Sequence, residues 1–263
     1  LDWGLDTDEL IPVPTLAQHL AREGIPTRAV LTAFFRGSGF TDMLYRGVQE
    51  IRAHRYASDL WVQLRHLLAQ TRGERSFVTV YWSGLDTVGH AYGHGTEAWE
   101  AEFRSIVHLL GREFLSELPG ADREGTLLLV TADHGQILVP DDHLLTANET
   151  PELSRHLQVP IMGEARAAFV HPRPGRSGAI RAFLEDVYPD WFVVVESEAA
   201  LEAGLMGSPV YDESFARAGE LLMLGRGDRA IQHSRPPFDL VSRHGGLTPE
   251  EMLVPLLIAR LDD

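Results

Sequence analysis

Short apolar, β-branched runs alternate with helical patterns along almost the whole chain, and this alternation most constrains its fold. We expect strands at 28–31, 77–82, 127–131, 168–170, 191–195, 220–224 and 252–258, and helices at 15–23, 59–70 and 178–188. A further long helix should begin after Thr96. Such alternation is typical of an α/β protein with a mainly parallel sheet and helices on both faces. With no repeat and no long linker, the sequence predicts a single domain over residues 1–263.

Composition excludes several classes of chemistry. The chain has no cysteine and no lysine, because all 23 of its basic residues are arginine. Thiol catalysis, zinc fingers, iron–sulfur clusters, Schiff bases and the P-loop lysine are therefore excluded. The formal net charge of −15 argues against a nucleic-acid polymer as partner, and it suits an acidic substrate only where metal cations reverse the local field.

Membrane and targeting signals are not visible in the sequence. No apolar run approaches the roughly 20 residues that a membrane-spanning helix needs, so we expect no membrane partner. The opening residues Leu1 to Gly4 do not have the pattern of a signal peptide, and they look like the interior of a longer protein.

Two clusters of metal-binding residue types follow predicted strands. Asp86 and His90 are four residues apart, so on a helical turn they share one face, and Gly89 between them would leave room beside an ion. Asp133 and His134 come one residue after 127–131, where Gly135 would permit the chain to turn. Ligands of open α/β sheets bind beyond the carboxyl ends of the strands, which is where both clusters are expected.

A third cluster, His244-Gly245-Gly246, precedes the predicted last strand. Each cluster alone also fits an ordinary helical turn or loop, but the presence of all three clusters in this order favours a metal-binding site. The two aspartates and three histidines are nitrogen and oxygen ligands suited to Zn²⁺ or Mn²⁺. Five ligands exceed one tetrahedral site and fit two metals that remain open to substrate. Of the other histidines, His94 and His143 lie near these clusters and are minor candidates.

These motifs resemble those of a known family. Residues 81–93, with Asp86-Thr-Val-Gly-His90, resemble the Asp-x-x-Gly-His motif of the alkaline phosphatase superfamily, and in particular of its type I phosphodiesterase/nucleotide pyrophosphatase branch. Residues 131–136 resemble its Asp-His-Gly motif, and 244–256 its closing segment. Residues 163–166, Gly-Glu-Ala-Arg, are similar to bacterial members. The resemblance covers roughly residues 12–259.

The resemblance implies a three-layer αβα sandwich of the alkaline phosphatase type and two divalent metal ions, Zn²⁺ first and Mn²⁺ second. By matched position, Asp86, His90 and His244 would hold one ion, and Asp133 with His134 the other. The family's Thr or Ser nucleophile and a further Asp ligand match nothing here, so we expect both upstream of Leu1. Ser38 and Thr41 are the alternatives within the chain, although neither lies in a matching motif.

The function implied is metal-dependent hydrolysis of phosphodiester or nucleotide pyrophosphate bonds in a small phosphate-ester substrate. The present chain alone would then be inactive, because it lacks the nucleophile. One alternative is phosphomonoester or phosphonate hydrolysis, or a phosphomutase reaction, on the same scaffold. Another is a metal-binding fragment without catalysis. Sulfatase activity is disfavoured because its cysteine-derived nucleophile has no precursor in the chain.

Overall fold

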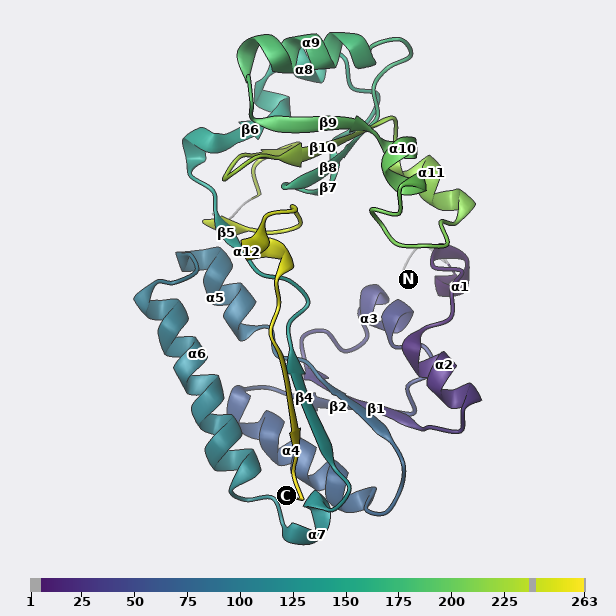
Figure 1. Cartoon of the computed structure of the whole chain (residues 1–263), viewed down its shortest axis with the longest axis vertical. Coiled ribbons are helices and arrows are strands. Elements are labelled where there is room, and N and C mark those ends of the chain that lie inside the picture. Colours follow the sequence, from purple (N-terminus) through teal and green to yellow (C-terminus); the bar gives the residue numbers. More distant parts are fainter. Residues whose placement is uncertain (1–5, 237–239, 263) are drawn as a thin grey trace. The chain divides into compact units, whose positions relative to one another are not determined.

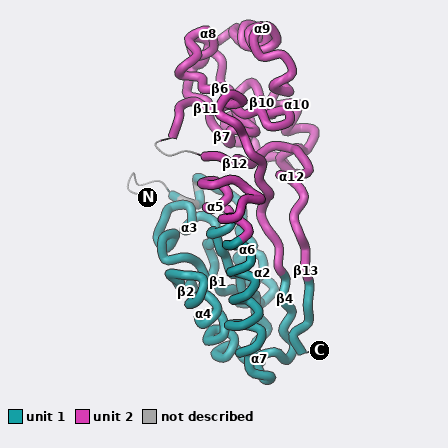
Figure 2. Tube along the Cα trace, turned by 90° about the vertical axis from the view of Figure 1, so that its left-hand side faces the viewer, with its two compact units in different colours: residues 1–85, 101–129, 258–263 teal, residues 86–100, 130–257 magenta. Residues whose placement is uncertain are grey.

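The protein is described by a computed structural model that covers residues 6–236 and 240–262. The chain forms two compact units, coloured separately in Figure 2. Unit 1 takes the chain up to Leu85, Ala101–Leu129 and the residues from Ile258 onward. Unit 2 takes Asp86–Glu100 and Val130–Leu257. The single domain over 1–263 stays a prediction.

A parallel three-stranded sheet forms the centre of unit 1. Strand β1 (Thr27–Thr32) lies between β2 (Glu50–His54) and β3 (Phe77–Val80), and both pairings are parallel. Each crossover contains a helix, as parallel neighbours require. The predicted α/β class with a parallel sheet is thus confirmed.

The helices of unit 1 are α1 (Thr7–Leu10), α2 (Leu16–Arg22), α3 (Gly39–Leu44), α4 (Ala57–Gln70), α6 (Glu97–Leu109), whose first turn belongs to unit 2, a π-helical segment (Leu110–Leu115) and α7 (Gly120–Arg123) (Figure 1). Of these, α4, α6 and the π-helical segment supply most of the apolar core of the unit. Leu60, Leu64 and Leu67 on one face of α4 pack with Val30 of β1 and Phe114 of the π-helical segment. The leucine spacing in 59–70 predicted this apolar face.

Unit 2 is built around an antiparallel sheet in the order β7-β8-β10-β9. Its strands are β7 (Met162–Glu164), β8 (Ala167–Val170), β9 (Phe192–Glu196) and β10 (Leu221–Gly225). Ile180 and Leu184 of α9 (Ser177–Val187) pack into the core of this unit with Val170, Leu221 and Met223 of the sheet. The sequence predicted strands here, but their antiparallel pairing differs from the mainly parallel sheet expected.

Unit 2 also contains a set of shorter helices and strands. They are α5 (Gly84–Tyr92), which begins in unit 1, β5 (Ile137–Leu138), β6 (Leu144–Thr146), α8 (Pro151–Ser154), α10 (Ser197–Glu202), α11 (Asp212–Ala218), β11 (Ala230–Gln232), β12 (Ser242–Arg243) and α12 (Pro249–Met252), with 3-10 turns at Asp141–His143 and Ala147–Glu149. Strand β6 pairs in parallel with β11, and β5 pairs antiparallel with β12.

The last strand differs from its prediction. Residues 252–258 were expected to form it, but Pro249–Met252 form helix α12 and strand β13 covers Leu256–Arg260. Thr248, Pro249 and two glutamates make a favourable helix start, because proline suits the first helical position and acidic side chains suit the first turn. The strand therefore begins only after Pro255.

Strand β13 pairs with β4 (Leu127–Thr131), and both strands extend from one unit into the other. Leu127 and Leu129 are about half exposed, at 53% and 51%, although the apolar run suggested a strand covered on both faces. In the part of the chain described, β4 is paired with β13 alone, and this accounts for the exposure. Among the described helices, none combines the length and apolar character needed to cross a bilayer.

Candidate metal centre

Helix α5 carries Asp86 and His90 on one face, as their spacing predicted. Nε2 of His90 lies 3.3 Å from Oδ1 of Asp86, and Nδ1 of His90 lies 2.8 Å from the carbonyl oxygen of Ser242. The hydrogen bond to Asp86 raises the pKa of His90 above its ordinary value, against the opposing effect of burial. Burial alone would raise the pKa of Asp86, but the bond from His90 and the nearby histidines hold it below its ordinary value.

Asp133 and His134 follow β4 after a single residue, Ala132. The backbone N–H of His134 donates to Oδ1 of Asp133 at 3.2 Å, so this aspartate shapes the turn. Nδ1 of His134 lies 3.0 Å from the carbonyl oxygen of Gly135, which leaves Nε2 of His134 available as a ligand atom. The Asp133 side chain is 63% exposed.

The pairing of β5 with β12 brings His244 to His134. Arg243 is the register partner of Ile137, so the residues just before β5 and just after β12 lie side by side. The rings of His134 and His244 stack with their centroids 3.7 Å apart, and the ring of His90 lies 5.2 Å from that of His244. Sequence spacing could not reveal this ladder, because each strand is only two residues long.

Asp86, His134 and His244 form a group that could hold a metal ion. Each offers one ligand atom, and these atoms all lie within 4.8 Å of one another. One carboxylate oxygen and two imidazole nitrogens make a donor set that fits Zn²⁺ or Mn²⁺, and three protein ligands would leave a coordination position open. The grouping from the resemblance placed His90, rather than His134, with Asp86 and His244.

Gln136 is a site residue that the sequence did not indicate as functional. Its Nε2 donates to the carbonyl oxygen of Asp86 at 3.2 Å and also to Oδ1 of Asp86. A Cβ atom on Gly89 would lie 2.0 Å from Oε1 of Gln136. Gly89 thus makes room for the glutamine that orients Asp86, whereas the sequence suggested room for the ion itself.

The minor candidates have other surroundings. The backbone N–H of His94 donates to Oγ of Ser242 at 3.2 Å, so His94 contacts the strand that supports His90. His143 lies 3.0 Å from Asp228 and next to the ring of Trp191. Neither belongs to the group of three.

Ser38 and Thr41 have capping roles in unit 1. Oγ of Ser38 accepts from the backbone N–H of Thr41 at 3.2 Å at the start of α3, and it donates to Oγ1 of Thr41 at 3.0 Å. Thr41 is buried, at 5% exposure. These contacts place both side chains in the N-terminal cap of α3.

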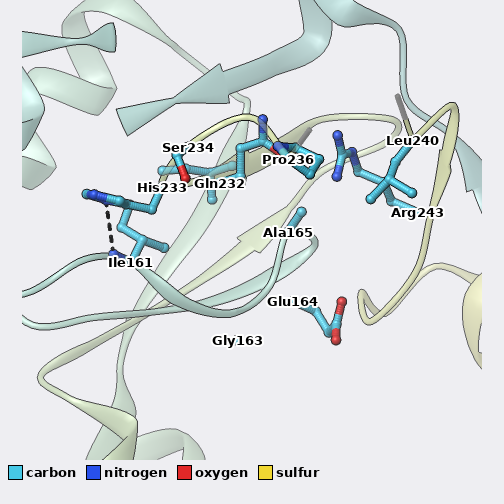
Figure 3. Close-up of a pocket in the computed structure, with 11 residues that line it drawn as sticks. Ile161, Gly163, Glu164, Ala165, Gln232, His233, Ser234, Pro236, Leu240 and Arg243 are labelled. Carbon is cyan, nitrogen blue, oxygen red and sulfur yellow. Dashed lines mark hydrogen bonds between the residues drawn. The ribbon is translucent and has the colours of Figure 1, made fainter. Parts of the chain in front are cut away.

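A cavity of about 230 Å³ is lined in part by Arg243, the residue before His244 (Figure 3). Glu164 and Arg243 are among the residues that line it. Arg243 is only 7% exposed, and within the described residues its Nε has no hydrogen-bond partner. Burial lowers the pKa of Arg243, and the charges of Asp141 and Glu164 oppose that shift. Neither residue was singled out for a role by the sequence.

Comparison with known proteins gives both a family and a fold. A family model described as type I phosphodiesterase / nucleotide pyrophosphatase matches residues 17–232. No curated protein matches the chain. Human ectonucleotide pyrophosphatase / phosphodiesterase 5 is similar in structure, with a TM-score of 0.70 at 17% identity, over 96% of this chain and 65% of that one.

Two further solved structures are similar. The inactive murine ectonucleotide pyrophosphatase / phosphodiesterase 5 in complex with AMP has a TM-score of 0.65 at 15% identity, over 92% of this chain and 62% of that one. Phosphonoacetate hydrolase from Sinorhizobium meliloti 1021 in complex with phosphonoformate has a TM-score of 0.62 at 15% identity, over 93% of this chain and 68% of that one. The chain therefore spans less than two thirds of the length of the human and murine structures. At these identities the likeness establishes the fold.

Proposed function

Because the chain belongs to the type I phosphodiesterase / nucleotide pyrophosphatase family of the alkaline phosphatase superfamily, we propose that it serves metal-dependent hydrolysis of phosphodiester or nucleotide pyrophosphate bonds. The observation that carries the proposal is the convergence of Asp86, His134 and His244 within 4.8 Å. The three come from separate elements of unit 2, and their donor atoms suit a divalent cation.

The proposed site takes two divalent ions, Zn²⁺ first and Mn²⁺ second. Asp86, His90 and His244 are proposed to hold one, and Asp133 with His134 the other, with His134 also in reach of the first group. When bound, such cations stabilise charge on phosphate oxygens and lower the pKa of a hydroxyl nucleophile. Two cations would also offset the net charge of −15 at the point where an acidic substrate binds.

Residues around the ligands orient them. The carbonyl oxygen of Ser242 accepts from Nδ1 of His90, and that of Gly135 accepts from Nδ1 of His134, so Nε2 of each ring is the atom directed to the site. Gln136 holds the carboxylate of Asp86 by its Nε2 donor. These contacts set the orientation of both rings and of the carboxylate before any cation arrives.

The substrate proposed is a small phosphate ester that reaches the cavity beside His244. Arg243 offers a guanidinium there, and its fork of donors suits phosphate oxygens better than a lysine ammonium does. Phosphonate hydrolysis is the second candidate, supported by the similarity to phosphonoacetate hydrolase. The nucleophile is proposed to be a Thr or Ser on a segment that precedes Leu1.

The test compares this chain with a longer chain that includes the preceding segment, both reconstituted with Zn²⁺ or Mn²⁺. We expect the longer chain to cleave bis-nitrophenyl phosphate and the 263-residue chain to show little or no cleavage. Asp86→Ala and His134→Ala in the longer chain should abolish cleavage, while His108→Ala, an exposed histidine of α6, should not.

Each contrary result has a specific meaning. Full activity of the short chain would identify an internal nucleophile, with Thr41 and Ser38 the first to be substituted. Activity that survived both Asp86→Ala and His134→Ala would remove the metal mechanism. Faster turnover of phosphonoacetate than of the diester would favour the phosphonate hydrolase.

A further inference from the structure

Arg166 and Glu251 form a buried ion pair in unit 2 that the proposed chemistry does not use. Their side chains are 0% and 1% exposed. Nη2 of Arg166 donates to Oε2 of Glu251 at 2.9 Å, and Nε donates to Oε1 at 3.1 Å. Two parallel charge-assisted bonds make a rigid, directional contact. Nη1 of Arg166 donates to the carbonyl oxygen of Arg229, so the guanidinium is held on each side.

Glu251 is bonded to the loops that carry both His134 and His244. The backbone N–H of Gly246, two residues after His244, donates to Oε1 of Glu251 at 2.8 Å. The backbone N–H of Gly135, immediately after His134, donates to the carbonyl oxygen of Glu251 at 2.8 Å. One residue therefore fixes the chain next to each of the two stacked imidazoles.

The glycines in these loops allow the approach. A Cβ atom on Gly135 would lie 2.0 Å from the carbonyl oxygen of Glu250, and one on Gly246 would lie 2.6 Å from Oε2 of Glu251. Neither glycine has a positive φ, so close contact rather than backbone conformation explains the residue type. Both loops are thus packed directly against α12 and the residue that bears the carboxylate.

A buried ion pair is a poor device for stability alone. The cost of removing two charges from water often equals their attraction, so apolar residues of similar size would stabilise the fold as well. Burial would raise the pKa of Glu251, but the bonds from Arg166, Gly246 and Thr248 hold it below its ordinary value, so it remains a carboxylate at neutral pH. A charged carboxylate at this position is well suited to orient the backbone that donates hydrogen bonds to it.

We propose that Arg166 and Glu251 are positioning residues that set the placement of His134 relative to His244 and thereby the affinity of the site for a divalent cation. The inference rests on the proposed metal-dependent function. It also gives a role to two sequence motifs that contain no proposed metal ligand: residues 163–166 include Arg166, and residues 248–252 include Glu251.

The experiment uses the whole 263-residue chain and the substitution Glu251→Gln, which keeps the shape but leaves Arg166 without its charged partner. Gly246→Ala is a second variant, in which the added methyl group displaces the Glu251 carboxylate without a backbone conflict. Asp122→Asn is the matched control, because Asp122 in unit 1 is also 1% exposed and pairs with Arg72 at 2.6 Å.

Three quantities are measured: Co²⁺ affinity from its visible absorption, amide hydrogen exchange of the metal-free chain, and the Tm. For Glu251→Gln and Gly246→Ala we expect Co²⁺ to bind about 10–100-fold more weakly, as when outer partners of metal ligands are removed. Exchange should accelerate in both 131–138 and 242–248. Asp122→Asn should lower the Tm without changing Co²⁺ affinity or exchange in those two segments.

The outcomes separate this proposal from the one on which it rests. A chain that bound no Co²⁺ before substitution would overturn the proposed function and the positioning role with it. Co²⁺ affinity that stayed at the unsubstituted level in both variants would overturn the positioning role alone. Faster exchange confined to 242–248 would also overturn it, since His134 would then be placed independently of Glu251. If Glu251→Gln does not fold, Gly246→Ala decides alone.

Discussion

The imidazole rings of His134 and His244 are stacked, with centroids 3.7 Å apart and planes 15° from parallel. Two imidazolium ions would repel each other at this distance. Burial, together with the charge of His134, lowers the pKa of His244 below its ordinary value. This lowering favours the neutral form of His244, which is the form that binds a metal ion.

Removal of a shared ligand should abolish cation binding. Asp86 and His244 belong both to the group that the structure brings together and to the group implied by the sequence resemblance. We expect Asp86→Ala and His244→Ala each to weaken Zn²⁺ binding by more than about 100-fold, beyond the usual effect of outer partners. Calorimetric titration measures this, with His108→Ala as the control that binds normally. Normal binding by His244→Ala would contradict the site.

The same titration of two further variants distinguishes the groupings. His134→Ala should have the larger effect on the first Zn²⁺ bound if the observed group of three is the tighter site. His90→Ala should have the larger effect if Asp86, His90 and His244 form that site. If both variants bound the first Zn²⁺ with the same affinity, neither group of three would be the tighter site.

Gly89→Ala should weaken cation binding with little change in stability. The new methyl group would meet Oε1 of Gln136 at 2.0 Å, and the flexible glutamine would move away and release its bond to Asp86. Alanine in place of glycine favours a helix by up to about 1 kcal/mol, which offsets the cost of that movement. Gly178→Ala in α9 is the matched control, since nothing lies within 4 Å of its added methyl group. Zn²⁺ affinity equal in the two variants would show that Gln136 does not orient Asp86.

Most helices and strands of the fold were predictable, because a long periodic pattern of apolar residues determines the secondary structure of its segment. Leu60, Leu64 and Leu67 indicated α4, and the capping box of Thr15 with Gln18 begins α2 where expected. The antiparallel order of β7 to β10 was not predictable, because apolar strands look the same whichever way their partners run.

The site was predictable in its ligand types but not in its supports. Asp86, His134 and His244 stand out as ligand residues, whereas Gln136, Arg166 and Glu251 are ordinary polar residues in a sequence. Their roles depend on contacts across many residues, such as the bond from Gly135 to Glu251. Sequence reasoning explained Gly135 by a turn, yet its φ is not positive, and the close approach of Glu250 is the reason for glycine.

Gly135→Ala should therefore destabilise the protein. Its methyl group would lie 2.0 Å from a backbone oxygen, which cannot move aside as a side chain can. Forced packing of this kind costs about 1–3 kcal/mol or more, and the bond to Glu251 would be lost as well. Chemical denaturation of the metal-free chain measures the loss. A free energy of unfolding within about 0.5 kcal/mol of the unsubstituted chain would contradict the close approach.

The charge of Glu251 should make part of the stability depend on pH. Because its pKa is lowered on folding, its contribution is fully present above the ordinary value of 4.5 and is lost as the pH falls through the lower folded value. At pH 7, Glu251→Gln should lower the free energy of unfolding by about 3–5 kcal/mol, since it leaves a buried guanidinium without its partner. The difference between the two chains should begin to shrink below about pH 4.5, where Glu251 of the unfolded chain takes up a proton, and it should go on shrinking as the pH falls toward the lower folded value. Urea denaturation of the metal-free chains from pH 7 to pH 3.5 measures the difference, and a gap that stays constant over this range would show that the Glu251 charge does not stabilise the fold.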